Sequence, residues 1–572
     1  MTVADNLVSQ LEAYGVEYVF GTCGHTNIAL LDAIGRGSIE FVIARHEQTA
    51  AHAADGYARA TGKPGVLLTH VGPGMMNAVT GVATAALDSV PLIAISGDIP
   101  SYLYGRHPHQ EVNLHADADQ TAIYRPFVKR AWHVHRAEDL ARFTERAFWT
   151  ATSGRPGAVL LNVPMDVFSR ELPGAVEYPL PAYAAKASLT TTDAERIAGL
   201  LAAAERPLIY IGGGLGVEGR RALRELAEHF EIPVAHSLMA KGALPDEHPL
   251  VLGMTGFWGL ELTNEYARKA DLVLAIATRF AETDASSWNP AYTWSFPPSR
   301  LIQIDIDPAE IGRNYPVEMG VVADASLAVT AIRGAARGHA RISRPDLLRQ
   351  IGNARHSLFA DSAERGKSDN FPLRPERILA DVRAALPDDA ILVTDVGWNK
   401  NGVAQCYPLP AAGRFITPGG ASTMGFGPAA ALGVQIAQPG RVVVALIGDG
   451  GMSAQLPAVP LAVERGLPVI FLVMNNRAHG TISDLQSKFF GRSYGCDFTD
   501  PQGRPYSPDF AAFGRACGAD GYLVESPAGL GEALRQAIEN RRPAVLDVPM
   551  VNEPVPTPGH WNITDIYQGL FE

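Results

Sequence analysis

Cysteine is scarce in this sequence. Only four cysteines occur among 572 residues, and they are widely separated, at Cys23, Cys406, Cys496 and Cys517. None of them forms a CxxC pair, so the pattern excludes a disulfide framework and a cysteine-based zinc site.

Blocks of positive charge and long hydrophobic runs are also missing. The 48 basic against 60 acidic residues give a net charge of −12, which disfavours binding to nucleic acid or to an anionic membrane. No apolar run is long enough to span a bilayer. The first residues, MTVADNLVSQLEAYGVEYVFG, lack a basic region followed by an apolar one. We therefore expect a cytoplasmic protein whose partner is a small molecule.

The chain does contain short apolar runs that alternate with helical stretches, three times over. This alternation predicts an α/β protein of three consecutive doubly wound parallel-sheet domains. We expect the domains at 1–175, 189–335 and 371–550, followed by a C-terminal tail at 551–572. A proline-rich stretch, Leu172 to Ser188, and a polar stretch, Gly334 to Asn370, are predicted to be linkers. The expected strands of the first block are 17–20, 40–44, 65–69, 91–96 and 158–163.

Two polar turns follow neighbouring strands of the third block. Gly448-Asp449-Gly450-Gly451 follows the apolar run 442–447, and Asn475-Asn476 ends the run 468–474. Parallel strands bring such turns together at the carboxyl edge of a sheet, where ligands bind. Carboxylate, amide and carbonyl oxygens suit a hard cation such as Mg²⁺. The alternative is that each motif is only a turn.

Two further motifs are ambiguous when taken alone. Glu47, in Arg45-His46-Glu47-Gln48, is expected at a helix N-terminus, where its charge could simply complement the helix dipole. Gly214-x-Gly216-x-x-Gly219 matches a dinucleotide fingerprint in letters. A glycine-rich turn between a strand and a helix would give the same letters.

Three segments follow one another along the chain: Arg45-His46-Glu47, Gly72-Pro73-Gly74-Met75-Met76-Asn77 and GDG…NN. Their order resembles that in the acetolactate synthase-like family of thiamine diphosphate (ThDP) enzymes. The resemblance covers nearly the whole chain. It implies a pyrimidine-binding, a central and a diphosphate-binding domain.

The resemblance implies roles for individual residues. Asp449, Asn476 and the Ala478 carbonyl would hold Mg²⁺, and Glu47 would share a proton with N1′ of the cofactor. Met424, in a segment similar to the family's G-x-x-T-M-G-[FY]-G, would lie beneath the cofactor. The implied cofactor contacts are Glu47, Val396, Gly397, Trp398, Asn399, Ser422, Met424, Gly448, Asp449, Gly450, Gly451, Asn476, Ala478, His479 and Gly480. Plain turn or helix-start roles remain alternatives for Trp398, Asn399 and Met424.

The implied activity is that of a carbon–carbon lyase or carboligase. It would act on a 2-oxo acid or 2-hydroxy ketone, by decarboxylation, an enamine intermediate and transfer to an acceptor carbonyl. The sequence departs from true acetolactate synthases around the expected substrate pocket. Thr481 and Leu485 replace a Met and a Trp, and His109-Gln110-Glu111 and Gly24-His25-Thr26 replace more apolar segments. The candidate catalytic residues are Glu47, His25, Gln110, His109 and Thr481.

Two alternatives to a carboligase stay open. The Gly-His-x-Asn segment also occurs in ThDP enzymes that hydrolyse cyclic 1,2-diketones, and other ThDP folds are non-catalytic binding or regulatory subunits.

The resemblance also bears on a second cofactor and on assembly. It implies at least a homodimer, and favours a homotetramer, because two subunits share each cofactor. Leu252–Gly256 and Thr278–Phe280 resemble flavin-contacting segments, whereas Ala281-Glu282-Thr283 departs from the family. The sequence thus leaves open whether FAD is bound.

Overall fold

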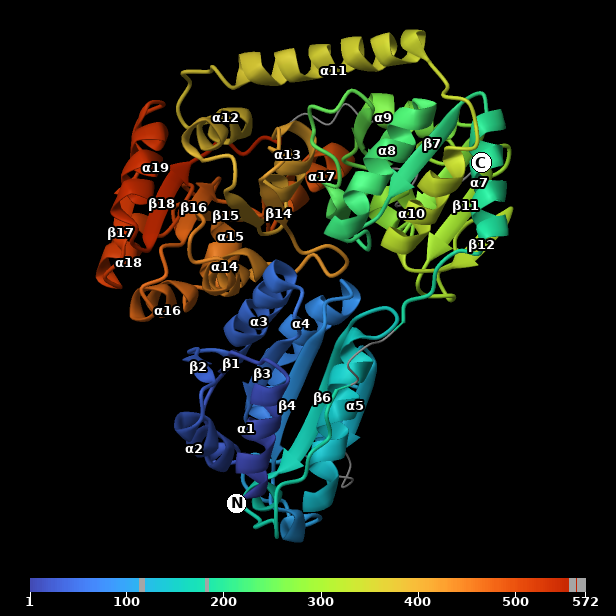
Figure 1. Cartoon of the computed structure of the whole chain (residues 1–572). Coiled ribbons are helices and arrows are strands. Elements are labelled where there is room, and N and C mark those ends of the chain that lie inside the picture. Colours follow the sequence, from blue (N-terminus) through green and yellow to red (C-terminus); the bar gives the residue numbers. More distant parts are fainter. Residues whose placement is uncertain (113–118, 181–184, 555–561, 563–572) are drawn as a thin grey trace.

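The computed structural model describes residues 1–112, 119–180, 185–554 and 562. It contains three six-stranded, all-parallel sheets, one after another along the chain (Figure 1). The predicted fold class, three doubly wound α/β units, is confirmed. Most of the expected C-terminal tail, and part of the first expected linker, lie outside the described residues.

The first domain carries its sheet in the order β2-β1-β3-β4-β6-β5. Its strands are β1 (Tyr18–Gly21), β2 (Glu40–Ile43), β3 (Gly65–Thr69), β4 (Leu92–Asp98), β5 (Arg130–His133) and β6 (Ala158–Pro164). Its helices are α1 (Val3–Ala13), α2 (Ile28–Arg36), α3 (Glu47–Thr61), α4 (Pro73–Leu87), α5 (Leu140–Thr152) and α6 (Met165–Phe168). The inner strands β3, β4 and β6 are buried along their whole length, which explains why they read as continuous apolar runs.

The central domain has the order β12-β11-β10-β7-β8-β9. Its strands are β7 (Pro207–Ile211), β8 (Val234–His236), β9 (Val251–Met254), β10 (Leu272–Ile276), β11 (Arg300–Asp305) and β12 (Met319–Val322). Its helices are α7 (Thr191–Ala203), α8 (Arg220–Phe230), α9 (Glu261–Arg268) and α10 (Ala325–Ala336).

The third domain repeats the topology of the first, with the order β14-β13-β15-β16-β18-β17. Its strands are β13 (Ile391–Thr394), β14 (Arg414–Ile416), β15 (Val443–Gly448), β16 (Ile470–Asn475), β17 (Asp520–Leu523) and β18 (Ala544–Pro549). Its helices are α12 (Pro375–Ala385), α13 (Trp398–Cys406), α14 (Phe426–Ala437), α15 (Asp449–Ala454), α16 (Ala458–Glu464), α17 (Gly480–Phe490), α18 (Phe510–Ala516) and α19 (Gly529–Asn540).

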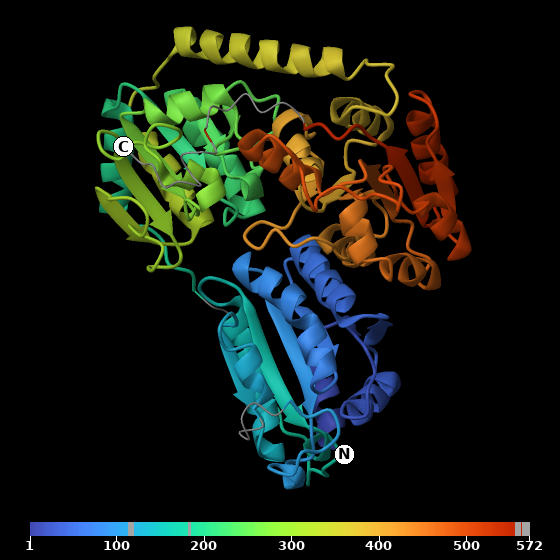
Figure 2. The same cartoon turned by 180° about the vertical axis from the view of Figure 1, so that it is seen from behind.

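The stretch expected as the second linker is mostly helical. Residues Pro345–Arg365 form α11, which bridges the central and third domains along one side of the molecule (Figures 1 and 2). Only Ile351 of this helix is fully buried. Its polar, weakly periodic sequence therefore resembled a linker, although proline at its first turn is a common helix start.

The first and third domains pack through α3 and α14. A Cβ on Gly433 would lie 1.8 Å from the Ala53 carbonyl oxygen, and one on Gly56 would lie 2.1 Å from that of Ala430. Glycine at these two positions therefore permits the close approach of the helices. The two domains also share one hydrophobic core, which includes Tyr57 and Phe426.

Among the described residues, no helix combines the length and the apolar character that crossing a membrane requires.

Candidate functional site

Three oxygens converge at the carboxyl ends of β15 and β16, which are neighbouring parallel strands. The side-chain oxygen of Asn476 lies 3.0 Å from Asp449 Oδ1 and 3.1 Å from the Ala478 carbonyl oxygen. Without a cation the Asn476 amide can turn, so that its nitrogen donates to both oxygens. With a cation, all three oxygens can face it. This donor set fits Mg²⁺.

The electrostatics of Asp449 also fit a cation. Its side chain is 2% exposed, and its Oδ2 atom has no hydrogen-bond partner. Burial raises the pKa of Asp449 to about 7, because the charged form loses its hydration. A cation would compensate the buried charge. No cluster of three or more His, Cys, Asp or Glu suited to a metal occurs in the described part of the chain, so the site depends on amide and carbonyl oxygens.

Glycines let the backbone close around this pocket. A Cβ on Gly451 would lie 1.8 Å from Asp395 Oδ2, and one on Gly480 would lie 2.4 Å from Asn476 Nδ2. A Cβ on Gly450 would meet the His479 ring at 2.8 Å and Met424 Cε at 3.3 Å. The structure thus brings His479 and Met424 to the same pocket.

The loop after β13 forms a second wall. Gly397 has a φ of 93°, and a Cβ there would lie 3.0 Å from Thr481 Oγ1. Asn399 donates from Nδ2 to the Val396 carbonyl at 3.0 Å, while its buried Oδ1 has no partner. Trp398 is buried, and its ring lies against Gly480. Asn399 therefore offers an unpaired acceptor, whereas the indole of Trp398 serves packing.

Two charged residues that our sequence analysis missed hold the loop before α14. The buried Lys400 donates to Ser422 Oγ at 2.7 Å, and Ser422 has a left-handed φ of 44°. Burial lowers the pKa of Lys400 to about 8. Asp88, from the first domain, accepts from the amides of Gly419 and Gly420 at 2.8 and 2.6 Å. These contacts fix the segment that presents Met424, whose side chain is 38% exposed.

Glu47 begins α3, as its sequence context predicts. Its carboxylate accepts from Thr22 Oγ1 at 2.7 Å and from Asn77 Nδ2 at 3.0 Å. A Cβ on Gly74 would lie 3.2 Å from Glu47 Oε1. The carboxylate is therefore held in one place by Thr22, just after β1, and by the first turns of α4.

A group of histidines lies beside Glu47. Nε2 of the buried His70 lies 2.9 Å from Nδ1 of the exposed His25, and the ring of His109 is 6.0 Å from that of His25. Gln110, next to His109, has a φ of 64° and is exposed. His25, His109 and Gln110 thus gather near Glu47. His70 follows a buried strand directly, as ligand-binding residues often do.

Glu47 and the Met424 loop belong to different domains. Glu47 contacts Thr22 and Asn77 of the first domain, whereas Met424 adjoins Gly450 of the third. Thr49, two residues after Glu47, bonds Gln455 at 2.6 Å, and Gln455 packs against Gly425. The two groups of residues thus come from two domains that pack against each other.

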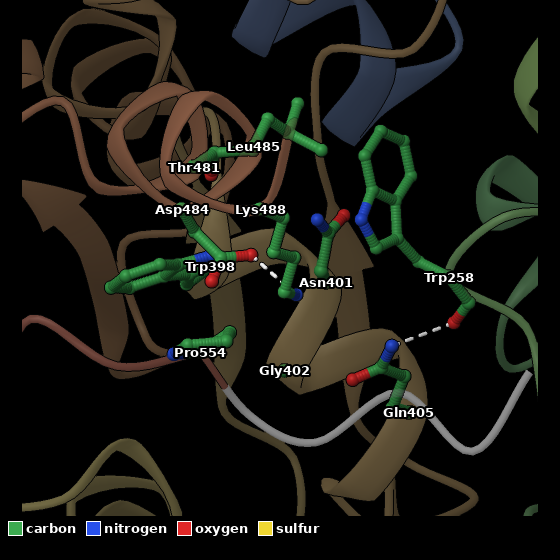
Figure 3. Close-up of a pocket in the computed structure, with 10 residues that line it drawn as sticks. All are labelled: Trp258, Trp398, Asn401, Gly402, Gln405, Thr481, Asp484, Leu485, Lys488 and Pro554. Carbon is green, nitrogen blue, oxygen red and sulfur yellow. Dashed lines mark hydrogen bonds and ion pairs between the residues drawn. The ribbon is translucent and has the colours of Figure 1, made fainter. Parts of the chain in front are cut away.

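Thr481 lines a hollow between α13, α17 and the central domain (Figure 3). Trp398 and Leu485 flank one part of it, and Trp258 enters from the central domain. Thr481 Oγ1 has no hydrogen-bond partner. Polar groups close the hollow through an Asp484–Lys488 pair at 2.7 Å and a bond from Gln405 to the Trp258 carbonyl at 2.7 Å.

Comparison with known proteins agrees with this arrangement. Residues 1–123 match the N-terminal TPP binding domain of thiamine pyrophosphate enzymes, residues 194–332 match their central domain, and residues 395–548 match their C-terminal TPP binding domain. Thiamine pyrophosphate is another name for ThDP.

Similar proteins match this chain over nearly its full length. A probable acetolactate synthase large subunit of Methanocaldococcus jannaschii is 32% identical, over 100% of this chain and 96% of that protein. The acetolactate synthase isozyme 3 large subunit of Escherichia coli is 32% identical, over 95% and 94%. The acetolactate synthase large subunit of Haemophilus influenzae is 32% identical, over 93% of this chain and 91% of that protein. The chain therefore belongs to the acetolactate synthase-like family of thiamine diphosphate-dependent enzymes.

Proposed function

We propose that this enzyme is a carboligase that joins a 2-oxo acid, after loss of its carboxyl group, to the carbonyl group of an acceptor. When bound, ThDP supplies a nucleophilic carbon and an electron sink for breaking and making carbon–carbon bonds. The observation that carries the proposal is the presence of both half-sites, the Glu47 carboxylate and the oxygen pocket at Asp449, in a chain similar throughout to acetolactate synthases.

The third domain would hold the diphosphate through a metal. Asp449, Asn476 and the Ala478 carbonyl would bind Mg²⁺, because the Asn476 amide lies within 3.1 Å of both other oxygens and can turn its own oxygen toward a cation. Gly448, Gly450, Gly451, His479 and Gly480, with the loop Val396–Asn399, would line the diphosphate. Ser422 and Met424 would support the rings of the cofactor.

The first domain would supply the proton chemistry. Glu47 would share a proton with N1′ of the pyrimidine. Thr22 and Asn77 leave the carboxylate fixed while its remaining lone pairs stay free for that contact. His25, His109 and Gln110 would face the substrate. Thr481 would line the hollow between the third and central domains.

Product analysis tests this function. We expect the enzyme with ThDP and Mg²⁺ to consume a 2-oxo acid and release a 2-hydroxy ketone or a 2-hydroxy-3-oxo acid, identified by mass spectrometry. Ring-opened carboxylic acids from cyclic 1,2-diketones, with no carboligation product, would instead favour the hydrolase. Failure to turn over any 2-oxo acid or diketone would leave only the non-catalytic alternative.

Each complete site would need two subunits, because in the family that this chain belongs to the pyrimidine-binding and diphosphate-binding domains around one cofactor come from different subunits. We therefore propose a homodimer as the smallest active unit, and a homotetramer as its larger assembly.

Complementation tests this assembly. Glu47→Gln and Asp449→Asn chains, co-expressed with different tags and purified as a mixed dimer, have one doubly altered site and one intact site. We expect about half of the wild-type activity from a twofold-symmetric pair, whereas each variant alone is nearly inactive. If both residues acted within one chain, the mixed dimer would stay inactive.

We also propose that the central domain binds a second cofactor, FAD. Thr278 and Thr255 are buried at the ends of β10 and β9, in the segments that resemble flavin contacts. The flavin would be structural, because carboligation has no net redox step. We expect flavin absorption near ~450 nm in the purified protein or after incubation with FAD; a protein that stays colourless after incubation would refute the proposal.

A further inference from the structure

The ends of β1 and β3 bring two histidines into direct contact. His25 lies four residues after β1, and His70 follows β3 immediately. Nε2 of His70 lies 2.9 Å from Nδ1 of His25, and the rings meet edge to face with centroids 4.6 Å apart. Gly24 permits this contact, because a Cβ there would overlap the His70 ring, at 1.7 Å from Cδ2.

A backbone carbonyl fixes the direction of this hydrogen bond. Nδ1 of His70 lies 2.9 Å from the Val71 carbonyl oxygen, which can only accept. Neutral His70 must therefore carry its proton on Nδ1 and present Nε2 as an acceptor. His25 must then donate from Nδ1, which leaves its own Nε2 without a proton.

We propose that His25 Nε2 is the base that moves a proton between substrate oxygens, and that His70 is a positioning residue that sets its tautomer. The proposal deepens, and rests on, the carboligase function above. It also names the substrate atoms concerned, a carbonyl and a hydroxyl oxygen on adjacent carbons. The exposed His25 and the fixed Glu47 lie on the same end of the first sheet, with Gly74 packed against both Glu47 and His70.

The proton balance of carboligation requires such a group. After loss of CO₂, the donor and the acceptor become one 2-hydroxy ketone, in which the donor oxygen returns to a carbonyl and the acceptor oxygen becomes a hydroxyl. Once the new carbon–carbon bond has formed, His25 Nε2 takes the proton from the donor oxygen as its C=O bond re-forms and gives it to the acceptor oxygen. This transfer is balanced in itself, and the one proton that the donor oxygen carries is taken up from solvent when the carboxyl group leaves as CO₂.

The surroundings keep His25 neutral and ready to accept. Partial burial, and then the neighbouring His70 and His109, lower the pKa of His25 below its usual value. His70 comes from the end of β3, His109 from the loop beyond β4, and Glu47 lies on the other side of Gly74. Because the base is the unprotonated ring, activity is present above this lowered pKa and is lost as the pH falls through it.

Matched replacements of His70 test the positioning role. His70→Gln places an amide oxygen where Nε2 stood and can still accept from His25, whereas His70→Leu cannot. We expect His70→Leu and His25→Gln to lower kcat by about 100-fold, with KM and ThDP affinity changed less than about threefold. His70→Gln should retain most of the activity. His356→Gln, on the exposed face of α11, is the control and should match the wild type.

Two further readouts separate this proposal from the proposed function itself. In His70→Leu, loss of the neighbouring imidazole should move the acid limb of the kcat profile to higher pH. In the protein without cofactor, nitrogen NMR of the histidine rings should show protonated Nδ1 and bare Nε2 for both His25 and His70. An Nε2-protonated His25, or equal activities for His70→Leu and His70→Gln, would overturn the proposal even in an active carboligase.

Discussion

Asp449→Asn is expected to weaken Mg²⁺-dependent ThDP binding by at least about 100-fold, since losing even a hydrogen-bond partner of a metal ligand typically costs 10- to 100-fold. The asparagine keeps the shape of the side chain but removes the anionic oxygen that opposes the cation. Asn476 and the Ala478 carbonyl would then face the metal without any negative charge from the protein. Without the carboxylate the cation would be held less tightly, and it would no longer neutralise the diphosphate beside it.

Titration calorimetry with saturating Mg²⁺ measures this loss, and thermal unfolding with and without ThDP and Mg²⁺ provides a second readout. Asp500→Asn is the control and should bind like the wild type, because Asp500 is a half-buried carboxylate of the same domain whose partners are Gln502 and Arg504. Unchanged ThDP affinity in Asp449→Asn would show that the three oxygens do not hold the metal.

The convergence of Asp449 and Asn476 could be predicted because parallel strands impose it. Each residue directly follows a buried apolar strand, and neighbouring parallel strands end at the same edge. The same logic places Glu47 at the start of α3. These are local consequences of strand and helix patterns, which a single sequence displays.

Contacts between distant segments could not be predicted in this way. Asp88 meets Gly419 only because the first and third domains pack together through α3 and α14, and Lys400 meets Ser422 across 22 residues of the third domain. Nothing in the local pattern of a lone lysine or aspartate reveals such a partner. The helix α11 was missed for the opposite reason: it buries almost nothing, so no apolar stripe marks it.

Glu47→Gln is expected to slow turnover by roughly 10²- to 10⁴-fold, the range typical of general acid–base groups. Glutamine has nearly the volume of glutamate, and its side-chain oxygen can still accept from Thr22 or Asn77. The fold and ThDP affinity should therefore change little. What glutamine cannot do is take up and release a proton, and the pyrimidine N1′ would lose its proton-sharing partner.

The loss should appear as slowed hydrogen–deuterium exchange at C2 of the bound cofactor, measured by rapid quench and NMR. Thr22→Val is an informative companion, because it removes one of the two donors that hold the carboxylate and leaves the carboxyl group itself. We expect it to slow exchange by about tenfold at most, in line with the loss of one charge-assisted hydrogen bond. Exchange at the wild-type rate in Glu47→Gln would reduce Glu47 to a carboxylate that complements the α3 dipole. The neighbouring His70–His25 pair, only one packed glycine away, would then be the next group in the first domain to test for this proton transfer.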